Sequence, residues 1–344
     1  MKKIRVLIVD DSLLMRRLIA AALATDPKIE IVGEAADPLE ARSAIKLLSP
    51  DVLTLDVEMP NMDGLSFLSK IMRLRPTPVV MVSNYTQRGA DISVRALELG
   101  AVECVCKPGP DNPNSFAELP GVIHTAYAAQ LRPPVVGTAS LSTHDNYKWD
   151  GKIVAIGAST GGVEALLSVL AAYPKNCPPT LIAQHMPAAF TRSFAARLNR
   201  HCAAHVQEAA DGVVIEAGHV YLAPGDHTHL ELSGGKARYT TRLTASALVN
   251  GHRPSVDVLF HSIARVAGQD AVGVILTGMG RDGADGLLAM RRVGAVTFGQ
   301  DQATSLIYGM PRSAQELGAV QVQAPLGVIG AQILATTDRR RRAA

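Results

Sequence analysis

The feature of this 344-residue chain that most limits its fold is an alternation of short apolar runs with helix-like segments between Ile4 and Cys106. Each apolar run has the length of a strand, and the segments between the runs repeat apolar residues at the helical spacing. Strands that alternate with helices in this way form a parallel sheet covered on both faces, because the crossovers are right-handed. We therefore predict a doubly wound α/β domain in residues 1–131, with strands at Ile4–Val9, Ile29–Gly33, Val52–Leu55, Val79–Val82 and Glu103–Cys106.

A second α/β pattern begins after residue 151 and predicts another doubly wound domain over residues 152–335. The segment between the two domains, residues 132–151, is rich in Pro, Gly, Ser, Thr and Asn. This composition is typical of an interdomain linker. Residues 336–344 form an Arg-rich tail. The clearest elements of the second domain are an apolar strand at Lys152–Gly157, a helix from about Gly162 to Ala172, and strands at Thr180–Gln184 and Ala271–Leu276.

Composition excludes several classes of function. Hydrophobic residues make up 47% of the chain and no apolar run is long enough to span a bilayer, so we expect a globular protein without membrane insertion. The net charge of +3 comes from Arg339–Arg342; without them, 30 basic residues face 31 acidic ones, which argues against a DNA-binding face. The apolar run after Met1 is too short for a signal-peptide core, and the four cysteines lack zinc or disulfide spacing. We expect free thiols and a cytoplasmic location.

Five polar residues stand at the carboxyl ends of strands in the first predicted sheet: Asp10, Asp11, Asp56, Ser83 and Lys107. The carboxyl ends of parallel strands open onto one edge, where doubly wound sheets bind ligands. Carboxylates this close together raise each other's pKa unless a divalent cation lies among them, and hard oxygen ligands suit Mg²⁺. Taken singly, each residue has a structural alternative, with Asp10 or Asp11 as a helix cap and Ser83 as a turn residue. Together they predict a Mg²⁺-dependent phosphoryl site in which the lysine and the hydroxyl hold phosphoryl oxygens.

This constellation resembles the receiver domain of response regulators, which has a flavodoxin-like fold. The resemblance implies that Asp56 accepts the phosphoryl group, that Asp10, Asp11, Asp56 and the Glu58 backbone carbonyl bind Mg²⁺, and that Ser83 and Lys107 sense the phosphate. One position departs from the pattern, because Cys104 stands where receivers commonly carry a Tyr or Phe that rotates on activation. The segments that carry the resemblance are 8–12 (IVDDS), 55–60 (LDVEMP), 82–84 (VSN) and 106–108 (CKP).

The second domain opens with the sequence Gly157-Ala-Ser159-Thr-Gly161-Gly162 between an apolar strand and an apolar helix. A strand, a sharp turn and a helix form the setting in which G-x-S-x-G exposes a nucleophilic serine near unpaired helix N–H groups. A dinucleotide-binding loop is an alternative, but the middle glycine is missing and no acidic residue ends the next strand. A plain structural turn is another. The motif favours Ser159 as a nucleophile.

A serine nucleophile needs a base and an orienting acid at the same sheet edge. His185 ends the strand after Ser159, and Asp282 lies in a glycine-rich loop, Thr277–Gly283, after a later strand. Backbone N–H groups of that loop also suit an oxyanion. Asp226, Asp257, Asp270, Asp285 and Asp301 compete for the acid role, with Asp285 and Asp301 as reserves.

Two histidine pairs are weak candidates for zinc. His201 and His205 would lie four apart on a helix, and His227 and His229 would share one face of a strand. Neither pair has an obvious third ligand, so we expect no zinc site.

The second domain resembles the chemotaxis receptor methylesterase (CheB) family, and with the receiver the resemblance spans nearly the whole chain. It implies that Ser159 is the nucleophile, His185 the general base and acid, Asp282 the orienting carboxylate, and the Met279 N–H an oxyanion donor with a contribution from Thr160. The segments that carry it are 155–162 (AIGASTGG), 184–187 (QHMP), 221–227 (YLAPGDH), 253–257 (RPSVD), 276–283 (LTGMGRDG) and 308–311 (YGMP).

The resemblance implies a phosphorylation-activated serine esterase. Its substrates would be glutamate γ-methyl esters on chemoreceptor helices, with receptor glutamines as a second substrate for deamidation. A histidine kinase would supply the phosphoryl group, and the esterase domain would need no cofactor. Two alternatives are an esterase or amidase of another two-component pathway, and a phosphorylation-dependent binding module that has lost catalysis.

Overall fold

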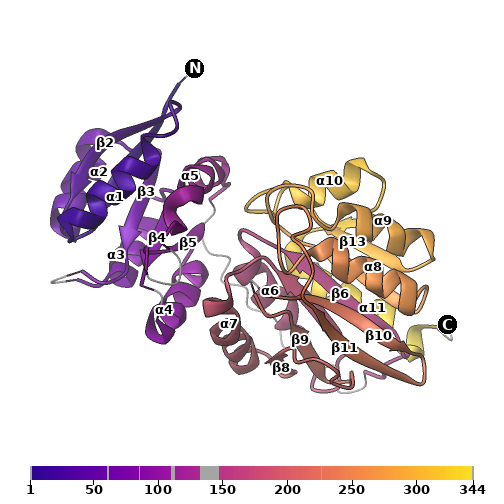
Figure 1. Ribbon diagram of the computed structural model, residues 1–344. Coiled ribbons are helices and arrows are strands. Elements are labelled where there is room, and N and C mark those ends of the chain that lie inside the picture. The colour runs from indigo at the N-terminus through magenta and orange to yellow at the C-terminus, as the bar shows by residue number, and fades with distance from the viewer. Residues whose placement is uncertain are drawn as a thin grey trace. The chain divides into compact units, whose positions relative to one another are not determined.

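The computed structural model describes residues 2–59, 62–84, 86–109, 113–131, 147–225 and 227–342. The chain forms two compact units, Met1–Val136 and Gly137–Ala344, each built around its own sheet (Figure 1). No helix in the described ranges has the length and apolar character needed to cross a membrane.

The first unit contains a five-stranded parallel sheet in the order β2-β1-β3-β4-β5, which confirms the predicted doubly wound domain. The central strands β3 and β4 are buried along their whole length, as expected for a sheet covered on both faces. The strands are β1 Ile4–Val9, β2 Ile29–Ala35, β3 Val52–Asp56, β4 Val79–Ser83 and β5 Glu103–Cys106. The helices are α1 Leu13–Leu23, α2 Pro38–Leu48, α3 Gly64–Leu74, α4 Gln87–Glu98, η1 Ser115–Glu118 and α5 Leu119–Ala128.

Four helices of this unit begin at a capping side chain. Ser12, Asp37, Asp63 and Thr86 each accept a hydrogen bond from a backbone N–H in the first turn of the helix that follows. Such caps satisfy donors that have no partner within the helix. They fix where each helix starts, and so fix the loops at the carboxyl edge of the sheet.

The second unit contains a seven-stranded parallel sheet in the order β14-β13-β12-β6-β7-β9-β8, with an antiparallel hairpin of β10 and β11 outside it. The strands are β6 Ile153–Ala158, β7 Thr180–Gln184, β8 His205–Glu208, β9 His219–Leu222, β10 His229–Gly235, β11 Arg238–Thr244, β12 Ala271–Ile275, β13 Val296–Gln300 and β14 Val322–Ala324. The helices are α6 Gly162–Leu170, α7 Ala188–His201, α8 Val256–Val266, α9 Ala284–Arg292, α10 Met310–Glu316, α11 Leu326–Thr337 and η2 Arg339–Arg342.

Two helices of the second unit follow glycines in the left-handed region. Gly161 (φ 79°) precedes α6 and Gly283 (φ 89°) precedes α9. A side chain at Gly161 would also place its Cβ 2.8 Å from Cβ of Leu306. Only glycine fits such a turn without strain. These tight turns bring the ends of β6 and β12 close to the helices that follow them.

The second unit extends beyond its predicted limits at both ends. The buried Tyr147 donates from its hydroxyl to Thr337 Oγ1 (2.9 Å), and the Arg339 N–H donates to the Lys148 carbonyl (2.8 Å). Residues 147–151 of the predicted linker therefore pack on the end of α11, and α11 itself runs two residues into the predicted tail. Residues 132–146 of the linker lie outside the described residues.

Candidate functional site

The first unit brings its predicted polar residues together at the carboxyl edge of the sheet. Asp10 follows β1, Asp56 and Ser83 end β3 and β4, and Lys107 follows β5. The Lys107 Nζ lies 3.1 Å from Asp10 Oδ2 and 3.0 Å from Asp56 Oδ1. One ammonium group therefore bridges two buried carboxylates that stand on neighbouring strands.

The carboxylates of this cluster fit a divalent cation. Ligand oxygens of Asp10, Asp11 and Asp56 lie within 4.8 Å of one another. Asp56 Oδ2 is buried and has no hydrogen-bond partner in the described part of the chain, although buried polar atoms are normally paired. Three carboxylates facing one ammonium leave excess negative charge, which a hard cation with oxygen ligands such as Mg²⁺ offsets. The Glu58 side chain is exposed and accepts a hydrogen bond from Asn84 Nδ2 (3.3 Å). The Glu58 backbone, in contrast, is hydrogen-bonded to Asp56.

Burial governs the charge state of the proposed phosphoacceptor. Burial raises the pKa of Asp56 to about 6; the Lys107 charge and hydrogen bond act against this rise, and the Asp10 charge adds to it. Burial by itself lowers the pKa of Lys107, but the two carboxylates outweigh burial and raise it. The lysine thus stays charged and available to an incoming anionic group.

Ser83 is linked to helix α4 rather than to an aromatic ring. Its Oγ lies 3.0 Å from Ser93 Oγ in a buried contact, and the Cys104 Sγ donates to the Ser93 carbonyl oxygen (3.5 Å). Cys104 is buried, and this burial raises the pKa of its thiol well above the usual value. This small thiol fills the position where the receiver pattern has a ring.

The second unit places Ser159 and His185 at adjacent strand ends. β6 and β7 pair in parallel with Ala158 opposite Gln184, so Ser159 and His185 each follow the last paired residue of their strand. The His185 N–H donates to the Ala158 carbonyl (3.1 Å). Three further contacts hold the Ser159 backbone. Its N–H donates to the Thr277 carbonyl (3.0 Å), and its carbonyl accepts from Gly162 N (2.7 Å) and Gln184 Nε2 (3.0 Å).

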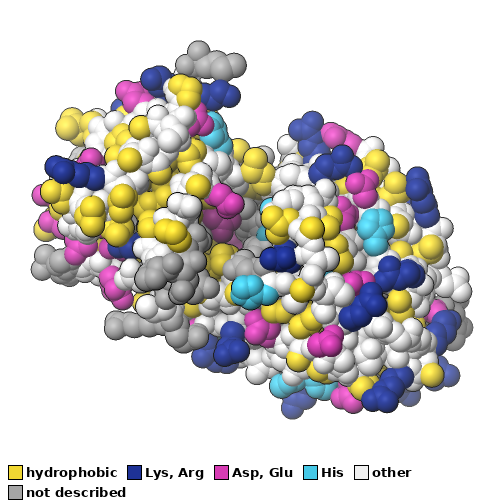
Figure 2. Space-filling view, viewed as in Figure 1, with side chains coloured by type: hydrophobic (Ala, Val, Ile, Leu, Met, Phe, Trp, Pro, Cys, Tyr) yellow, Lys and Arg dark blue, Asp and Glu magenta, His cyan; other side chains and the backbone are white. Residues whose placement is uncertain are grey.

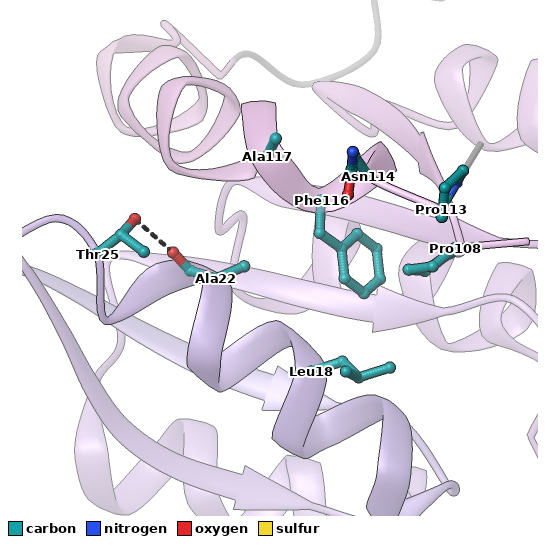
Figure 3. A pocket seen from close by; sticks show the side chains of 8 residues that line it. All are labelled: Leu18, Ala22, Thr25, Pro108, Pro113, Asn114, Phe116 and Ala117. Atoms are coloured by element: carbon teal, nitrogen blue, oxygen red, sulfur yellow. Dashed lines mark hydrogen bonds between the residues drawn. The ribbon is translucent and has the colours of Figure 1, made fainter.

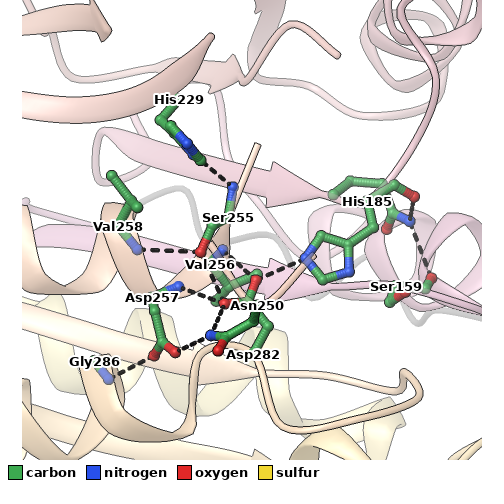
Figure 4. A network of polar contacts seen from close by, with 11 residues as sticks. Ser159, His185, His229, Asn250, Ser255, Val256, Asp257, Val258, Asp282 and Gly286 are labelled. Atoms are coloured by element: carbon green, nitrogen blue, oxygen red, sulfur yellow. Dashed lines mark hydrogen bonds and ion pairs between the residues drawn. The ribbon is translucent and has the colours of Figure 1, made fainter. Parts of the chain in front are cut away.

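His185 is hydrogen-bonded to the predicted acid. Its Nε2 lies 2.8 Å from Asp282 Oδ2, and both side chains are almost wholly buried. Its Nδ1 is buried and has no hydrogen-bond partner in the described ranges. In Figure 4 the His185 ring lies between Asp282 and Ser159. The ring therefore offers a proton-accepting nitrogen on the side of the serine while its other nitrogen is held by the carboxylate.

Asp282 is held ionised by several donors. Besides His185, its carboxylate accepts from Ser255 Oγ (2.8 Å), Val256 N (2.7 Å), Asp257 N (3.3 Å) and Asn250 Nδ2 (2.9 Å). Burial by itself raises the pKa of Asp282, but the hydrogen bond and charge of His185 and the other donors hold it well below its usual range. An ionised carboxylate at this position stabilises a charge on the imidazole.

The glycine-rich loop after β12 lies against Ser159. A Cβ at Gly278 would lie 2.7 Å from Cβ of Ser159, so the loop approaches the serine more closely than a side chain allows. Met279, the predicted oxyanion donor, is the next residue. Thr160, the second candidate, is buried, and its carbonyl accepts from Thr277 Oγ1 (3.0 Å). The positions of both residues beside Ser159 are consistent with their proposed roles, which stay predictions.

The competing carboxylates bind other groups. Asp257 accepts from Gly286 N (2.7 Å) and Asn250 Nδ2 (2.7 Å), Asp270 pairs with Lys236, and Asp285 pairs with Arg281 (2.8 Å). Asp301 caps the turn at Thr304. Asp226 lies outside the described residues.

The predicted secondary structure is wrong for both histidine pairs, since neither His201 and His205 nor His227 and His229 share one element. α7 ends at His201 and His205 begins β8, because the chain becomes extended at Cys202 and then pairs with β9. His229 is buried at the start of β10, where its Nδ1 accepts from Ser255 N (3.0 Å), whereas His227 is exposed outside the strand. In the described part of the chain, the one cluster with metal-ligand spacing is the aspartate cluster of the first unit.

Sequence reasoning missed two neighbours of the His185–Asp282 pair. Asn250 bridges Asp282 and Asp257, and the His252 ring stacks on His185 with centroids 3.7 Å apart and an interplanar angle of 11°. The Asn250-Gly251 dipeptide predicts a tight turn, but nothing in its local pattern says which residues the turn contacts.

The surface of the first unit carries apolar side chains over α1 and α2 (Figure 2), among them Leu13, Leu14, Leu39 and Leu47. A groove of about 400 Å³ lies beside α1 (Figure 3). The described residues that line it carry no carboxylate, amine or imidazole, so they offer no group for acid–base or metal chemistry. The lining residues are Leu18, Ala22, Thr25, Pro108, Pro113, Asn114, Phe116 and Ala117.

Comparison with known proteins agrees with both halves of this description. Residues 6–114 match the response regulator receiver domain and residues 154–333 match CheB methylesterase. A protein-glutamate methylesterase/protein-glutamine glutaminase of Rhizobium johnstonii is 58% identical over 98% of this chain and 97% of its own length. One of Caulobacter vibrioides is 57% identical over 99% of this chain and its full length.

A solved structure, the catalytic domain of Thermotoga maritima CheB methylesterase, is 37% identical to the part of the chain that it matches. It covers 54% of this chain and 98% of its own, with a TM-score of 0.53. The chain therefore belongs to the CheB methylesterase family, with a response regulator receiver domain ahead of its esterase domain.

Proposed function

We propose that this protein is a phosphorylation-activated serine esterase that hydrolyses glutamate γ-methyl esters on the cytoplasmic helices of chemoreceptors. The observation that carries the proposal is the buried His185–Asp282 pair at the sheet edge where Ser159 directly follows the neighbouring strand β6. Receptor glutamines are the second substrate class, because an amide differs from the ester only in its leaving group. The names of the relatives pair the same two activities.

Acylation begins when Ser159 Oγ attacks the ester carbonyl while its proton passes to His185 Nδ1. The imidazolium is stabilised by the Asp282 carboxylate through Nε2–H. Backbone N–H groups of the loop at Met279, with Thr160, stabilise the negative charge on the tetrahedral oxygen. The C–O bond to the methoxy group then breaks, and His185 returns the proton so that methanol leaves.

Deacylation repeats these steps with water. His185 Nδ1 removes a proton from the attacking water, and the second tetrahedral intermediate collapses to release the glutamate carboxyl group. Ser159 Oγ regains its proton from His185. With glutamine, ammonia leaves in the first step and the same acyl-enzyme forms.

The receiver domain supplies the control. A histidine kinase donates the phosphoryl group to Asp56, and Lys107 and Ser83 contact phosphoryl oxygens. The contact of 3.0 Å between Lys107 Nζ and Asp56 Oδ1 supports this role of the lysine. Asp10, Asp11, Asp56 and the Glu58 carbonyl would hold Mg²⁺, which would neutralise part of the charge on the phosphoryl group. Such a protein works in the cytoplasm, without inserting into the membrane and without DNA.

The decisive experiment measures methanol released from methylated receptor by the phosphorylated full-length protein. Ser159→Ala and His185→Ala should each reduce turnover by several orders of magnitude, and the double variant should be scarcely worse, because the two residues act as a unit. Ser168→Ala, at an exposed position of α6, is the matched control and should behave as wild type. Additive losses would assign separate roles to Ser159 and His185, and wild-type turnover in Ser159→Ala would remove the serine from the mechanism.

A further inference from the structure

A single β-turn contacts both residues of the His185–Asp282 pair. Val249 and His252 exchange two backbone hydrogen bonds, of 3.1 and 3.0 Å, and enclose Asn250 and Gly251. Both enclosed residues have positive φ, 53° at Asn250 and 82° at Gly251. Asn-Gly is the dipeptide that adopts such a primed turn at least cost. The turn is therefore a rigid support rather than an open loop.

One side chain of this turn holds the acid. Asn250 Nδ2 donates to Asp282 Oδ1 (2.9 Å) and to Asp257 Oδ2 (2.7 Å), so its amide lies between two buried carboxylates (Figure 4). Two carboxylates this close repel each other, and a shared donor offsets the repulsion. This contact fixes the turn relative to Asp282.

The other side chain covers the base. The His252 ring is nearly parallel to the His185 ring at a centroid distance of 3.7 Å. Burial, and after it repulsion from His185, lowers the pKa of His252 to about 4, although Asp282 acts in the opposite direction. Near neutral pH, His252 is therefore an uncharged ring that adds no second cation beside an imidazolium.

The hydrogen bond to Asp282 does not by itself fix the His185 ring. A single Nε2–Oδ2 contact leaves the ring free to tilt about that contact, and tilting moves Nδ1 away from the serine side. A flat neighbour at van der Waals distance removes this freedom and keeps water off one face of the ring. Small errors in the position of a catalytic base are costly, on the order of 10²-fold for a displacement of about 1 Å.

We propose that His252 is a positioning residue whose ring holds the His185 imidazole in the plane where Nε2 binds Asp282 and Nδ1 faces Ser159. The proposal rests on the function proposed above for Ser159, His185 and Asp282. It assigns no proton transfer to His252, so any flat, uncharged ring at this position should serve.

The test compares His252→Ala with His252→Phe in the phosphorylated full-length protein. His252→Ala should lower kcat on methylated receptor by about 10²-fold with little change in KM. His252→Phe should recover most of this loss, because the flat ring returns without the nitrogens. His201→Ala, at an exposed helix end, is the control and should match wild type. Unchanged kcat in His252→Ala, or a Phe variant as slow as the Ala variant, would overturn the proposal.

A spectroscopic measurement supplies the second readout. Aromatic ¹³C relaxation should show a rigid His185 ring in wild type and in His252→Phe, and added ring motion in His252→Ala, because the ring then tilts about its contact with Asp282. An equally rigid His185 ring in wild type and in His252→Ala would contradict the proposal. The rate at which a fluorophosphonate labels Ser159 in the same variants does not require a receptor. It separates the two claims: no methanol from wild type, together with slower labelling of His252→Ala, refutes the proposed substrate and supports the positioning role.

Discussion

At the residue scale, the carboxylate of Asp282 is the group whose environment is most fully specified. Both of its oxygens accept hydrogen bonds. Oδ2 accepts from His185 Nε2 and Val256 N, and Oδ1 accepts from Ser255 Oγ, Asn250 Nδ2 and Asp257 N. In an asparagine side chain at position 282, one of the two oxygens would be replaced by an NH₂ group, which would face donors instead of acceptors. Asparagine therefore cannot satisfy the site in either orientation.

We predict that Asp282→Asn lowers kcat by about 10⁴-fold, because His185 loses the acceptor that selects its Nε2–H tautomer. The misplaced NH₂ group should also cost about 1–3 kcal/mol of folding free energy. Methanol release measured well below the unfolding temperature separates the two effects. Asp285→Asn and Asp301→Asn are the controls, since their carboxylates bind Arg281 and the Thr304 turn. A loss of similar size in either control would mean that Asp282 is not the orienting acid.

The receiver permits a second prediction at this scale. Asp56→Asn should abolish Mg²⁺-dependent labelling by a small-molecule phosphodonor, because an amide neither accepts the phosphoryl group nor matches a carboxylate as a metal ligand. Lys107→Ala should retain some labelling but transmit less activation, since Nζ contacts the acceptor oxygen without being the nucleophile. Chelation of Mg²⁺ should lower labelling of wild type to the level of Asp56→Asn. Labelling that is undiminished in Asp56→Asn would remove Asp56 as the phosphoacceptor.

At the scale of secondary-structure elements, close backbone approach positions the nucleophile. A Cβ added at Gly278 would overlap Ser159 and would also collide with the sulfur of Met310. We predict that Gly278→Ala displaces the end of β6 or the loop after β12 and lowers kcat by at least 10²-fold. The measurement is methanol release together with fluorophosphonate labelling of Ser159.

Gly327→Ala provides the matched control for that substitution. Gly327 lies in α11 with open space around its Cα, so alanine there should keep activity and raise stability by up to about 1 kcal/mol. If Gly278→Ala labelled Ser159 as fast as Gly327→Ala does, close approach of the loop would not be what positions the serine.

The elements also show which parts of the fold and of the site can be predicted from one sequence. The strands of the first unit were predicted to within two residues, because each contains a short apolar run and four of the five, all but β2, have a polar residue at the carboxyl end. The site residues Ser159, His185 and Asp282 were predicted for the same reason. His252 and Asn250 were not, since they reach the site through a turn that follows an antiparallel hairpin, and such contacts leave no local periodicity. The four-residue spacing of His201 and His205 misled because strand pairing, rather than helical period, determines the chain path after Cys202.

At the scale of the whole molecule, the packing of Tyr147 defines where an isolated catalytic fragment should begin. Its ring is buried and its hydroxyl is bonded to the end of α11, and Asn176 Nδ2 donates to its carbonyl (2.9 Å). We predict that a fragment starting at Tyr147 is more stable than one starting at Asp150 by about 3–5 kcal/mol, the usual cost of removing a buried aromatic side chain. Equal midpoints of denaturant unfolding would show that the segment contributes nothing.

The same fragment tests how phosphorylation controls the esterase. When a short linker joins two domains, each is present near the other at a millimolar effective concentration. Even a weak affinity of the unphosphorylated receiver for the esterase domain would therefore keep the esterase active site covered. Phosphorylation can relieve such inhibition only through a differential affinity of a few kcal/mol between the two states. We therefore predict that residues 147–344 demethylate receptors without a phosphodonor and faster than the unphosphorylated full-length protein.

Full-length Asp56→Asn is the control for this comparison, because it should keep the low basal rate whether or not phosphodonor is present. Adding the separate receiver, residues 1–131, to the fragment should restore inhibition only at high concentration, since the tether is gone. If the folded fragment shows no gain over the unphosphorylated parent, the receiver does not restrain the esterase domain. The phosphoryl group would then have to act on another step, such as recruitment of the enzyme to the receptor, and the difference between phosphorylated and unphosphorylated protein would appear in KM rather than in kcat.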